Sequence, residues 1–458
     1  MAGRGKNAAW GMGTEVTAGT GVTPAVYTPI TEANIEAPRE IIESAALAAS
    51  RTILQSTNAS QAPALSFTNE NDGSAFMQGF YYWNGGDDGH AVSAFTGAKI
   101  TTAPTGSAAS GGTLADGDYK YKVASIINWT ALDHDYVMPA SAESLAITIA
   151  TSNNTVDLAW TDPTTLTLPT GFTYVGTAIY RTIADGSVHA FVYYKSGTGN
   201  TWSDDGSETR DAAVVPYTTN LYEHICDLPS SDASLPAFSA TFYQDIAQSK
   251  RIAGARMDTF ELSIAGQNEI SRFTYAGLGR LVAAVANPSP SVTINEPIAG
   301  SRIDVAINDV SECTIESITV SGSNGMEHVN GICDQDYPLD VEENDFRRVT
   351  VTLVRQLLDL DMWNRVQNGT VFSITIRFHG QPVVASGSTL NVTDHGIDAT
   401  PVPYIVELDL YECRAGNADA PVSGPGRIQE TITATVNKSA TEGTDLQLRV
   451  INTTSNYT

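Results

Sequence analysis

The chain has 458 residues, of which 42% are hydrophobic and 17% are charged, and its 51 acidic and 25 basic side chains give a net charge of -26. This length corresponds to roughly two to four domains, and the apolar fraction is sufficient for a buried core in each of them. So large an acidic excess excludes a broad basic surface, and with it a protein that grips duplex DNA by neutralising phosphates.

The N-terminus and the cysteines indicate the compartment in which the chain folds. Residues 1–6 are basic, but no apolar run follows them, so we expect no signal peptide. No stretch of about 18 apolar residues occurs, so we expect no membrane-spanning helix. The four cysteines lie far apart and are expected to be buried free thiols: Cys226, Cys313, Cys333 and Cys413. The sequence therefore predicts a protein that folds in a cytoplasm.

Residues 36–54 are the first predicted helix. This segment is rich in Ala after Pro38, and Ile41, Ala45 and Ala48 fall on one side of a helical projection. Alanine has the highest helix propensity of the amino acids, so the composition favours a helix here.

Residues 101–216 differ in character from the rest of the chain. A stretch rich in Thr, Gly, Ser and Ala opens the segment, and evenly spaced strands follow, one of which contains Trp160. Regular short strands with turns between them are typical of a β-sandwich. Because similar sequence lies on both sides, we interpret the segment as a domain inserted into another one. The predicted strands cover residues 119–123, 144–149, 156–160, 177–181 and 191–194.

The C-terminal part has the clearest strand pattern. Apolar and polar residues alternate in four segments, as where Ser373 and Thr375 separate Phe372, Ile374 and Ile376. Such alternation predicts long strands of one antiparallel system, each with one buried face. The four segments are residues 302–308, 348–353, 372–378 and 404–411.

A short helix is predicted between the second and third of these strands. Leu358, Met362 and Val366 recur at a spacing of four within residues 357–366, and Gly369 is a suitable C-terminal cap. A strand, a short helix and a strand in succession indicate an α+β layer.

A weak internal repeat is visible outside the inserted segment. Residues 261–268 match residues 317–324 in their apolar pattern and in the Gly and Asn that close them. The match suggests that the body of the protein contains two copies of one sheet unit. The predicted layout is a first unit in residues 1–100 and 217–290, the inserted domain in residues 101–216, and a second unit in residues 291–458.

Residue patterns of known catalytic and binding sites are missing from the sequence. The seven histidines form no HExxH motif and no pair with metal-ligand spacing, and His134 is better explained as part of an acidic turn. Acidic pairs such as Asp87 and Asp88 do not continue as a calcium-binding loop, and there is no phosphate-binding loop or nucleophile elbow. We therefore predict no enzymatic activity, no catalytic residue, no metal site and no cofactor.

Several segments resemble the phage tail tube protein family. Residues 10–24 are similar to the Gly- and Thr-rich start of these proteins, which leads into a strand and an acidic segment. The likeness continues in residues 256–262, 313–320 and 346–378, in the same order along the chain. The resemblance implies a major tail tube protein of a long-tailed, siphovirus-type phage, with two β-sheet or barrel units that contain short helices.

The inserted segment resembles the fibronectin-III and immunoglobulin-like modules that are common in phage structural proteins. Residues 111–123, 158–160, 179–182 and 201–206 carry this likeness. Residues 128–134 depart from it, because they replace the usual serine-rich stretch after the first strand. The resemblance implies a mainly β protein in which this sandwich decorates the exterior.

The family resemblance also implies partners. Tail tube subunits form stacked rings whose sheets join edge to edge into an inner β-barrel. Two units per chain imply a trimeric ring with pseudo-sixfold symmetry, whereas one unit per chain implies a hexamer, and we favour the trimer. The expected partners are further copies of the chain, the tape-measure protein, the tail terminator and distal tail proteins, and viral DNA in transit. Assembly is expected in the host cytoplasm, with no membrane involved.

The polar faces of the strands are then candidates for the surface of the bore. Acidic and hydroxyl side chains with few bases suit a channel through which DNA passes without sticking. The alternative is that these residues face bulk solvent outside the barrel. The candidate lumen-facing residues are Glu261, Asp304, Glu316, Glu407 and Asp409.

Two other functions stay open on the sequence. One is a capsid decoration or baseplate protein that contains the same inserted module. The other is a carbohydrate-binding adhesin or a hydrolase on a β-scaffold, with Trp129, Trp202 or residues 80–83 as a sugar platform, although aromatic-rich strands are more often part of a core.

Overall fold

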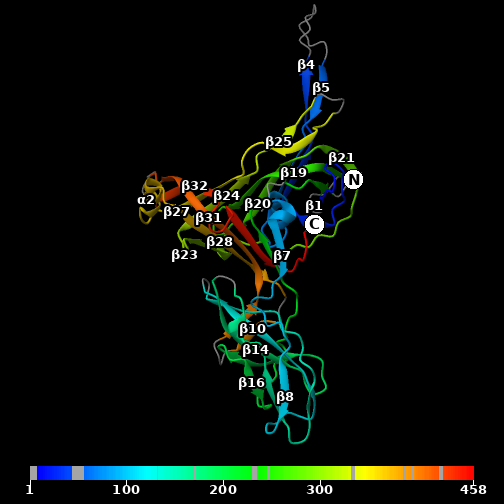
Figure 1. Cartoon of the computed structure of the whole chain (residues 1–458), viewed down its shortest axis with the longest axis vertical. Helices are drawn as coiled ribbons and strands as arrows, with labels where there is room; N and C mark the ends of the chain where they lie inside the picture. The colour runs from blue at the N-terminus through cyan, green and yellow to red at the C-terminus, as the bar shows by residue number, and fades with distance from the viewer. Residues whose placement is uncertain are drawn as a thin grey trace, which may run out of the picture.

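The computed structural model describes residues 8–43, 56–130, 133–168, 171–229, 235–244, 248–331, 336–384, 388–392, 397–421 and 427–457. Strands make up most of it, and the predicted mainly β fold is confirmed. Figure 1 shows a body of long strands, a hairpin that projects from one end and a lobe of shorter strands at the other. The described residues contain two α-helices, α1 (Met77–Trp83) and α2 (Asp361–Asn368).

The body is built on one antiparallel sheet of eight strands, which pair in the order β3–β6–β20–β19–β24–β27–β32–β31. We call it the eight-stranded sheet. Its strands are β3 (Glu32–Glu36), β6 (Ala64–Glu70), β20 (Arg272–Leu278), β19 (Gln248–Ile264), β24 (Ile315–Ser323), β27 (Arg348–Gln356), β32 (Gln429–Asn437) and β31 (Pro403–Asp419).

Alternation of polar and apolar residues gives this sheet one buried side and one side that faces solvent. In β32, for example, Ile432, Ala434 and Val436 are buried, and Thr431 and Thr433 are exposed. Valine, isoleucine and threonine are β-branched and favour an extended backbone, which explains why this pattern forms a strand.

Outer strands cover the buried side of the eight-stranded sheet and share one hydrophobic core with it. Two strands, β19 and β31, belong to both layers: each has 17 residues, and a β-bulge near Asp258 or Gly416 interrupts its pairing. The outer strands are β1 (Ala9–Thr14), β2 (Val26–Pro29), β7 (His90–Ala94), β17 (Tyr222–Cys226), β18 (Phe238–Tyr243), β21 (Leu281–Ala286), β22 (Ile303–Ile307), β23 (Val310–Ser311), β28 (Phe372–Pro382) and β33 (Leu446–Asn452). The four strands predicted in the C-terminal part are confirmed as β22, β27, β28 and β31.

The same succession of elements occurs twice along the chain. The first series is β1, β2, β3, β6, α1, β18, β19, β20 and β21, and the second is β22, β23, β24, β27, α2, β28, β31, β32 and β33. The pairings recur too, since β1–β18, β18–β19, β19–β20 and β6–β20 have counterparts in β22–β28, β28–β31, β31–β32 and β27–β32. Each series therefore gives four strands to the eight-stranded sheet, and the β19–β24 pair joins the two sets.

The short sequence repeat does not mark corresponding positions in the two series. Its segments lie in β19 and β24, which are antiparallel neighbours with Leu262 opposite Val320. The counterpart of β19 is β31, and the counterpart of β24 is β3. The sequence likeness arises because neighbouring strands bury the same side of one sheet and so alternate in the same way. The alignment suggested by the repeat is therefore wrong.

The lobe contains β-layers around its own cores, with Trp129 and Trp160 buried in them. Strands β29 (Leu390–Val392) and β30 (Ile397–Pro401) lie between β28 and β31 in the chain and extend one layer, because β30 pairs in parallel with β11. The lobe thus includes strands from outside residues 101–216. Its other strands are β8 (Thr105–Ala109), β9 (Gly117–Tyr119), β10 (Tyr121–Trp129), β11 (His134–Val137), β12 (Ile147–Ile149), β13 (Thr155–Ala159), β14 (Phe172–Arg181), β15 (Ala190–Ser196) and β16 (Thr201–Asp204).

Two hairpins lie beyond the ends of the strands of the eight-stranded sheet. The hairpin of β4 (Arg39–Glu43) and β5 (Ser56–Gln61) follows β3, and that of β25 (Met326–Val329) and β26 (Asp340–Glu343) follows β24. The helix predicted over residues 36–54 is wrong for residues 36–43, which are the part of it that the structure describes. Ile41 and Ile42 are β-branched, and pairing of β4 with β5 outweighs the helix propensity of the neighbouring Ala residues. Residues 44–55 lie outside the described residues.

The two helices differ in how far the sequence predicts them. The predicted helix near residues 357–366 is confirmed as α2, where Met362 is buried and Gly369 caps the end with a φ of 63°. Helix α1 lies in the aromatic segment that ends at Trp83, and all seven of its residues are buried. A helix that is buried on all sides has no amphipathic stripe, so no periodic signal distinguishes it from a strand.

Candidate functional site

The solvent-facing side of the eight-stranded sheet is dominated by serine and threonine. We call it the hydroxyl face. Its hydroxyl residues come from six strands: Ser66, Thr68, Thr259, Ser263, Thr274, Ser317, Thr319, Ser321, Ser323, Thr350, Thr352, Thr431, Thr433 and Thr435.

Hydroxyl groups on adjacent strands of this face hydrogen-bond to each other. The Oγ1 atoms of Thr68 and Thr274 are 3.0 Å apart, and Ser321 Oγ lies 2.8 Å from Thr350 Oγ1. Such cross-strand pairs stabilise a sheet modestly and keep the side chains flat against it. Because each hydroxyl both donates and accepts, the face can also hold a layer of water without carrying charge.

Two basic residues of the hydroxyl face, Arg272 and Arg348, lie next to acids, and a third, Arg414, is opposite Thr435. Arg272 is opposite Glu70 across β20 and β6, and Arg348 is 3.0 Å from Asp345. Glu261 of β19 is exposed on the same face. Tight binding of nucleic acid requires several cations that can neutralise phosphates, and this arrangement does not provide a cluster of them.

Two of the five predicted lumen-facing residues lie on the eight-stranded sheet. Glu261 is exposed on the hydroxyl face. Glu316 lies at an irregularity in the β24–β27 pairing and accepts a hydrogen bond from Gln429 of β32.

The other three lie on the outer layer, where they surround Arg377. The guanidinium of Arg377 contacts Glu407 and is 3.9 Å from Asp304. Asp409 accepts a hydrogen bond of 2.6 Å from Thr375 Oγ1. We call Asp304, Thr375, Arg377, Glu407 and Asp409 together the Arg377 cluster. The structure therefore places the five candidate acids on two separate surfaces.

The Arg377 cluster is a partly buried network of paired charges. Burial, and then the neighbouring Glu407 carboxylate, raise the pKa of Asp409 to about 6. The sequence could not separate this surface from the hydroxyl face, because β31 alternates in the same way in both layers. Only the register, which sets Arg377 opposite Glu407 and Thr375 opposite Asp409, brings the charges together.

The eight-stranded sheet ends in two edges. In the part of the chain that the structure describes, β3 pairs with β6 alone, and β31 beyond Cys413 pairs with β32 alone. The main-chain groups of such edges can pair with a strand of another chain. Both edges belong to the same sheet as the hydroxyl face, so a partner at either edge would extend that face.

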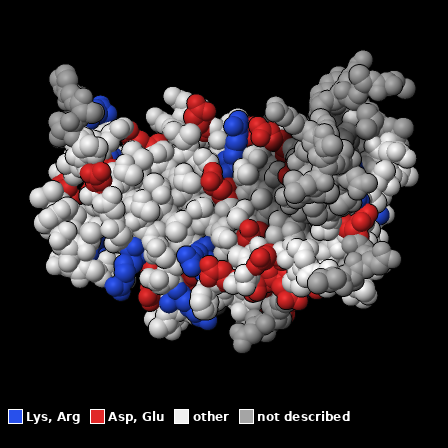
Figure 2. Space-filling model, turned by 90° about the horizontal axis from the view of Figure 1, so that it is seen from above, with Lys and Arg blue, Asp and Glu red and all other residues white. Residues whose placement is uncertain are grey.

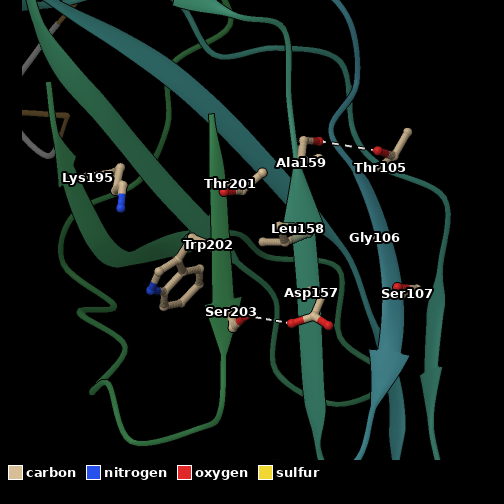
Figure 3. A pocket seen from close by; sticks show the side chains of 10 residues that line it. All are labelled: Thr105, Gly106, Ser107, Asp157, Leu158, Ala159, Lys195, Thr201, Trp202 and Ser203. Atoms are coloured by element: carbon tan, nitrogen blue, oxygen red, sulfur yellow. Dashed lines mark hydrogen bonds between the residues drawn. The ribbon is translucent and has the colours of Figure 1, made fainter. Parts of the chain in front are cut away.

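The lobe carries a shallow hollow over β8, β13 and β16, which Figure 3 shows from close by. Ser203 Oγ donates a hydrogen bond to Asp157, and Thr105 Oγ1 donates one to the carbonyl oxygen of Ala159. Trp202 stacks on Tyr193 with the ring centres 4.9 Å apart. The hollow is lined mainly by short polar side chains, and its one carboxylate is already hydrogen-bonded.

The other aromatic residues considered as a sugar platform are buried. Phe80, Tyr81, Tyr82 and Trp83 all belong to the core of the body, and Trp129 is 1% exposed in the lobe. A sugar cannot stack on a ring that is covered on both faces, so these residues are core residues.

The buried histidines are held in their neutral form. His90 and His224 lie 3.1 Å apart, and burial lowers the pKa of His90 to about 4. Burial likewise lowers the pKa of His379, which contacts Tyr136 at the base of the lobe, to about 4. Among the described residues, no three His, Cys, Asp or Glu side chains gather as a metal site.

A sheet with one buried side, a hydroxyl-rich free side and two unpaired edges is typical of a subunit that completes its sheet by joining other chains. A comparison with known families matches residues 5–436 to the phage tail tube proteins. The chain therefore belongs to the phage tail tube protein family and is a structural component of a phage tail. A search of curated proteins gives no match.

On the face seen in Figure 2, acidic and basic side chains lie in small groups among described residues that are mostly uncharged. Within the described ranges, none of the helices has the length and apolar character that crossing a membrane requires.

Proposed function

We propose that this chain is the major tail tube subunit of a long-tailed, siphovirus-type phage, and that three copies form each ring of the tube. The rings stack into a conduit through which viral DNA leaves the virion. The observation that carries the proposal is the eight-stranded sheet, which has four strands from each of two equivalent series and an open edge at each end.

The polarity of the strands supports a trimeric ring. Corresponding strands, such as β6 and β27, run in the same direction because three antiparallel strands separate them in the sheet order. A rotation about the axis of a ring preserves strand direction, so the two series can be related by a rotation of this kind. Three chains would then present six equivalent units around the bore.

In this arrangement the hydroxyl face lines the bore. Hydroxyl groups retain water, and two of the few cations on the face, Arg272 and Arg348, have acidic neighbours, so DNA phosphates find no cluster of positive charge. The Arg377 cluster then lies in the outer layer of the wall. The acidity that matters for passage of DNA is therefore that of Glu261 and its neighbours on the hydroxyl face.

The proposed layout keeps two tube units and an inserted domain. The first unit takes residues 1–100 and 217–290, the second takes residues 291–458, and the lobe built on residues 101–216 decorates the exterior as an immunoglobulin-like or fibronectin-III module. The two series of elements fall within these two units. The tape-measure protein would fill the bore before DNA ejection, and the terminator and distal tail proteins would meet the end rings. Assembly would take place in the host cytoplasm.

Electron microscopy of the purified protein and of labelled virions tests this proposal. We expect tubes whose end views have threefold symmetry, and label along the whole tail shaft. A chain that stays monomeric under all assembly conditions and is absent from the shaft would contradict it. Label confined to the capsid or to the baseplate would instead support a decoration or baseplate protein.

A further inference from the structure

The two corresponding helices, α1 and α2, have different surroundings. All seven residues of α1 are buried. Around α2, by contrast, Leu358, Leu360 and Trp363 are 69%, 59% and 47% exposed. A group of large apolar side chains on the surface marks a place where another surface docks.

The end of α1 at Trp83 is covered by the second series of the same chain. Asn324 donates a hydrogen bond of 2.9 Å to the carbonyl oxygen of Trp83, and the guanidinium of Arg347 lies 4.1 Å from the centre of the Trp83 ring. Gly322 of β24 also packs on this ring so closely that a Cβ atom has no room. The end of helix α1 at Trp83 is therefore buried by the junction at which β24 pairs with β19.

A hairpin completes this internal junction. Arg256 of β19 donates a hydrogen bond to the carbonyl oxygen of Val341 in β26 and is 3.9 Å from Asp340. The bulges in β19 and β31 make Arg414 the counterpart of Arg256, and Arg414 is exposed. The second series thus has a corresponding helix (α2), strand edge (β31) and arginine (Arg414). No other segment in the described part of the chain covers these three features.

We propose that a second copy of this chain covers α2 and the edge of β31 in the way that the second series covers α1 and β19. Strand β3 of the second copy would pair with β31, and its β4–β5 hairpin would lie beside Arg414. This proposal rests on the proposed ring and assigns the surfaces that join one chain to the next. The residue that corresponds to Gly322 is Ala37, so a small side chain would again face the helix.

The register of this second pairing follows from the internal one. The bulges in β19 and β31 make Glu261 correspond to Asp419. Strand β20 pairs with β6 and β6 with β3, just as β32 pairs with β27 and β27 with β24. Following the paired residues through these two sets of strands makes Glu36 of β3 the counterpart of Ser321 of β24. Because Glu261 lies opposite Ser321 inside the chain, Asp419 is expected opposite Glu36 of the second copy.

A disulfide tests this register directly. Residues directly opposite in antiparallel strands have Cα atoms about 4.5–5.5 Å apart, which is within the range that a disulfide spans. In a background with Cys313→Ser and Cys333→Ser, the variant Glu36→Cys with Asp419→Cys should form links between chains after assembly. Substitution also removes two like charges from the junction. Since β3 and β31 are at opposite edges of the sheet, the link cannot form within one chain.

The matched control is Glu32→Cys with Asp419→Cys, which moves one thiol four residues along the same face of β3. Non-reducing electrophoresis of oxidised tubes should give a covalent species of three chains for the first variant and monomers for the control. Tubes that form normally without this link, or that link equally well in the control, would overturn the junction and leave the proposed function standing. A parent chain that forms no tubes would overturn the proposed function itself.

A second variant tests the part that α2 plays. Trp363→Ser should leave the thermal unfolding of the unassembled chain unchanged and should reduce tube formation at least about tenfold, because about 1.4 kcal/mol lost at an interface changes its equilibrium tenfold. Val310→Ser, on an exposed strand of the outer layer, is the control. Normal tube formation by Trp363→Ser would show that α2 is not part of the junction.

Discussion

The hydroxyl face and the Arg377 cluster are two polar surfaces that share strand β31, and they differ in how their charges are arranged. Strand β31 contributes to both, with Glu407 and Asp409 in the outer layer and Asp419 in the eight-stranded sheet. On the outer layer the acids are paired with an arginine and partly buried. On the hydroxyl face the charges are sparse and lie among hydroxyl groups. The comparison teaches that an alternating strand pattern reveals which side is polar but not what the polar side does.

The largest difference between the two surfaces should appear when an arginine is removed. Arg377→Ala removes the cation that contacts Glu407 and lies 3.9 Å from Asp304, and loss of one partner of a buried ion pair costs about 3–5 kcal/mol. We expect the lower half of this range because the cluster is only partly buried. Urea unfolding of the unassembled chain, followed by tryptophan fluorescence, measures the change.

Arg272→Ala on the hydroxyl face is the matched control, since Arg272 is exposed in β20. Its effect on the free energy of unfolding should stay within about 0.5 kcal/mol. Equal losses in the two variants would show that the two surfaces do not differ in the way described.

A smaller effect on the free energy of unfolding is expected from replacing Asp409, the carboxylate whose pKa is raised. The pKa of Asp409 is about 6 in the folded chain, above its ordinary value, so the folded state binds this proton more tightly than the unfolded state. The charged carboxylate therefore lowers stability as pH rises from about 4 to 6, and the loss is complete above pH 6. Asp409→Asn should stabilise the chain by about 1–2 kcal/mol at pH 7.5 and by much less at pH 4.

Thr433→Ala, which changes an exposed residue that does not titrate, provides the control for this pH dependence. The difference in free energy of unfolding between this variant and the parent chain should be the same at both pH values. If the difference in free energy of unfolding between Asp409→Asn and the parent chain does not change with pH, the raised pKa of Asp409 would be contradicted.

The smallest effect on stability, and the largest on passage of DNA, is expected on the hydroxyl face. Thr274→Lys with Thr433→Lys adds two cations at exposed positions, so the free energy of unfolding should change by less than about 1 kcal/mol. Ejection of DNA from virions that carry this variant should be slower, because the added cations attract phosphates. Val310→Lys in the outer layer should leave the ejection rate unchanged.

Much of the strand content could be predicted from the sequence, because alternating β-branched residues are a local signal. The strands at Ile303–Ile307 and Arg348–Gln356 and the short helix that ends before Gly369 follow this signal. The hairpin strand at Arg39–Glu43 was not predicted because its stability comes from pairing with β5 (Ser56–Gln61), whereas the Ala residues between the two strands favour a helix.

The candidate site could be predicted only in part, and the reason is register. Glu261 and Asp409 both occupy polar positions of alternating strands, and the sequence does not show which layer each strand half joins. That information lies in the bulges near Asp258 and Gly416, where β19 and β31 pass from one layer to the other. The hydroxyl-rich composition of the face was visible, but its continuity across six strands depends on pairings between distant segments.

The most direct test of the account is the orientation of the eight-stranded sheet in a reconstruction of the assembled tube by electron microscopy. We predict that Thr274 and Thr433 face the central opening and that Arg377 lies in the outer layer of the wall. A tube in which Arg377, Glu407 and Asp409 border the opening, with the hydroxyl face turned outward, would contradict the account.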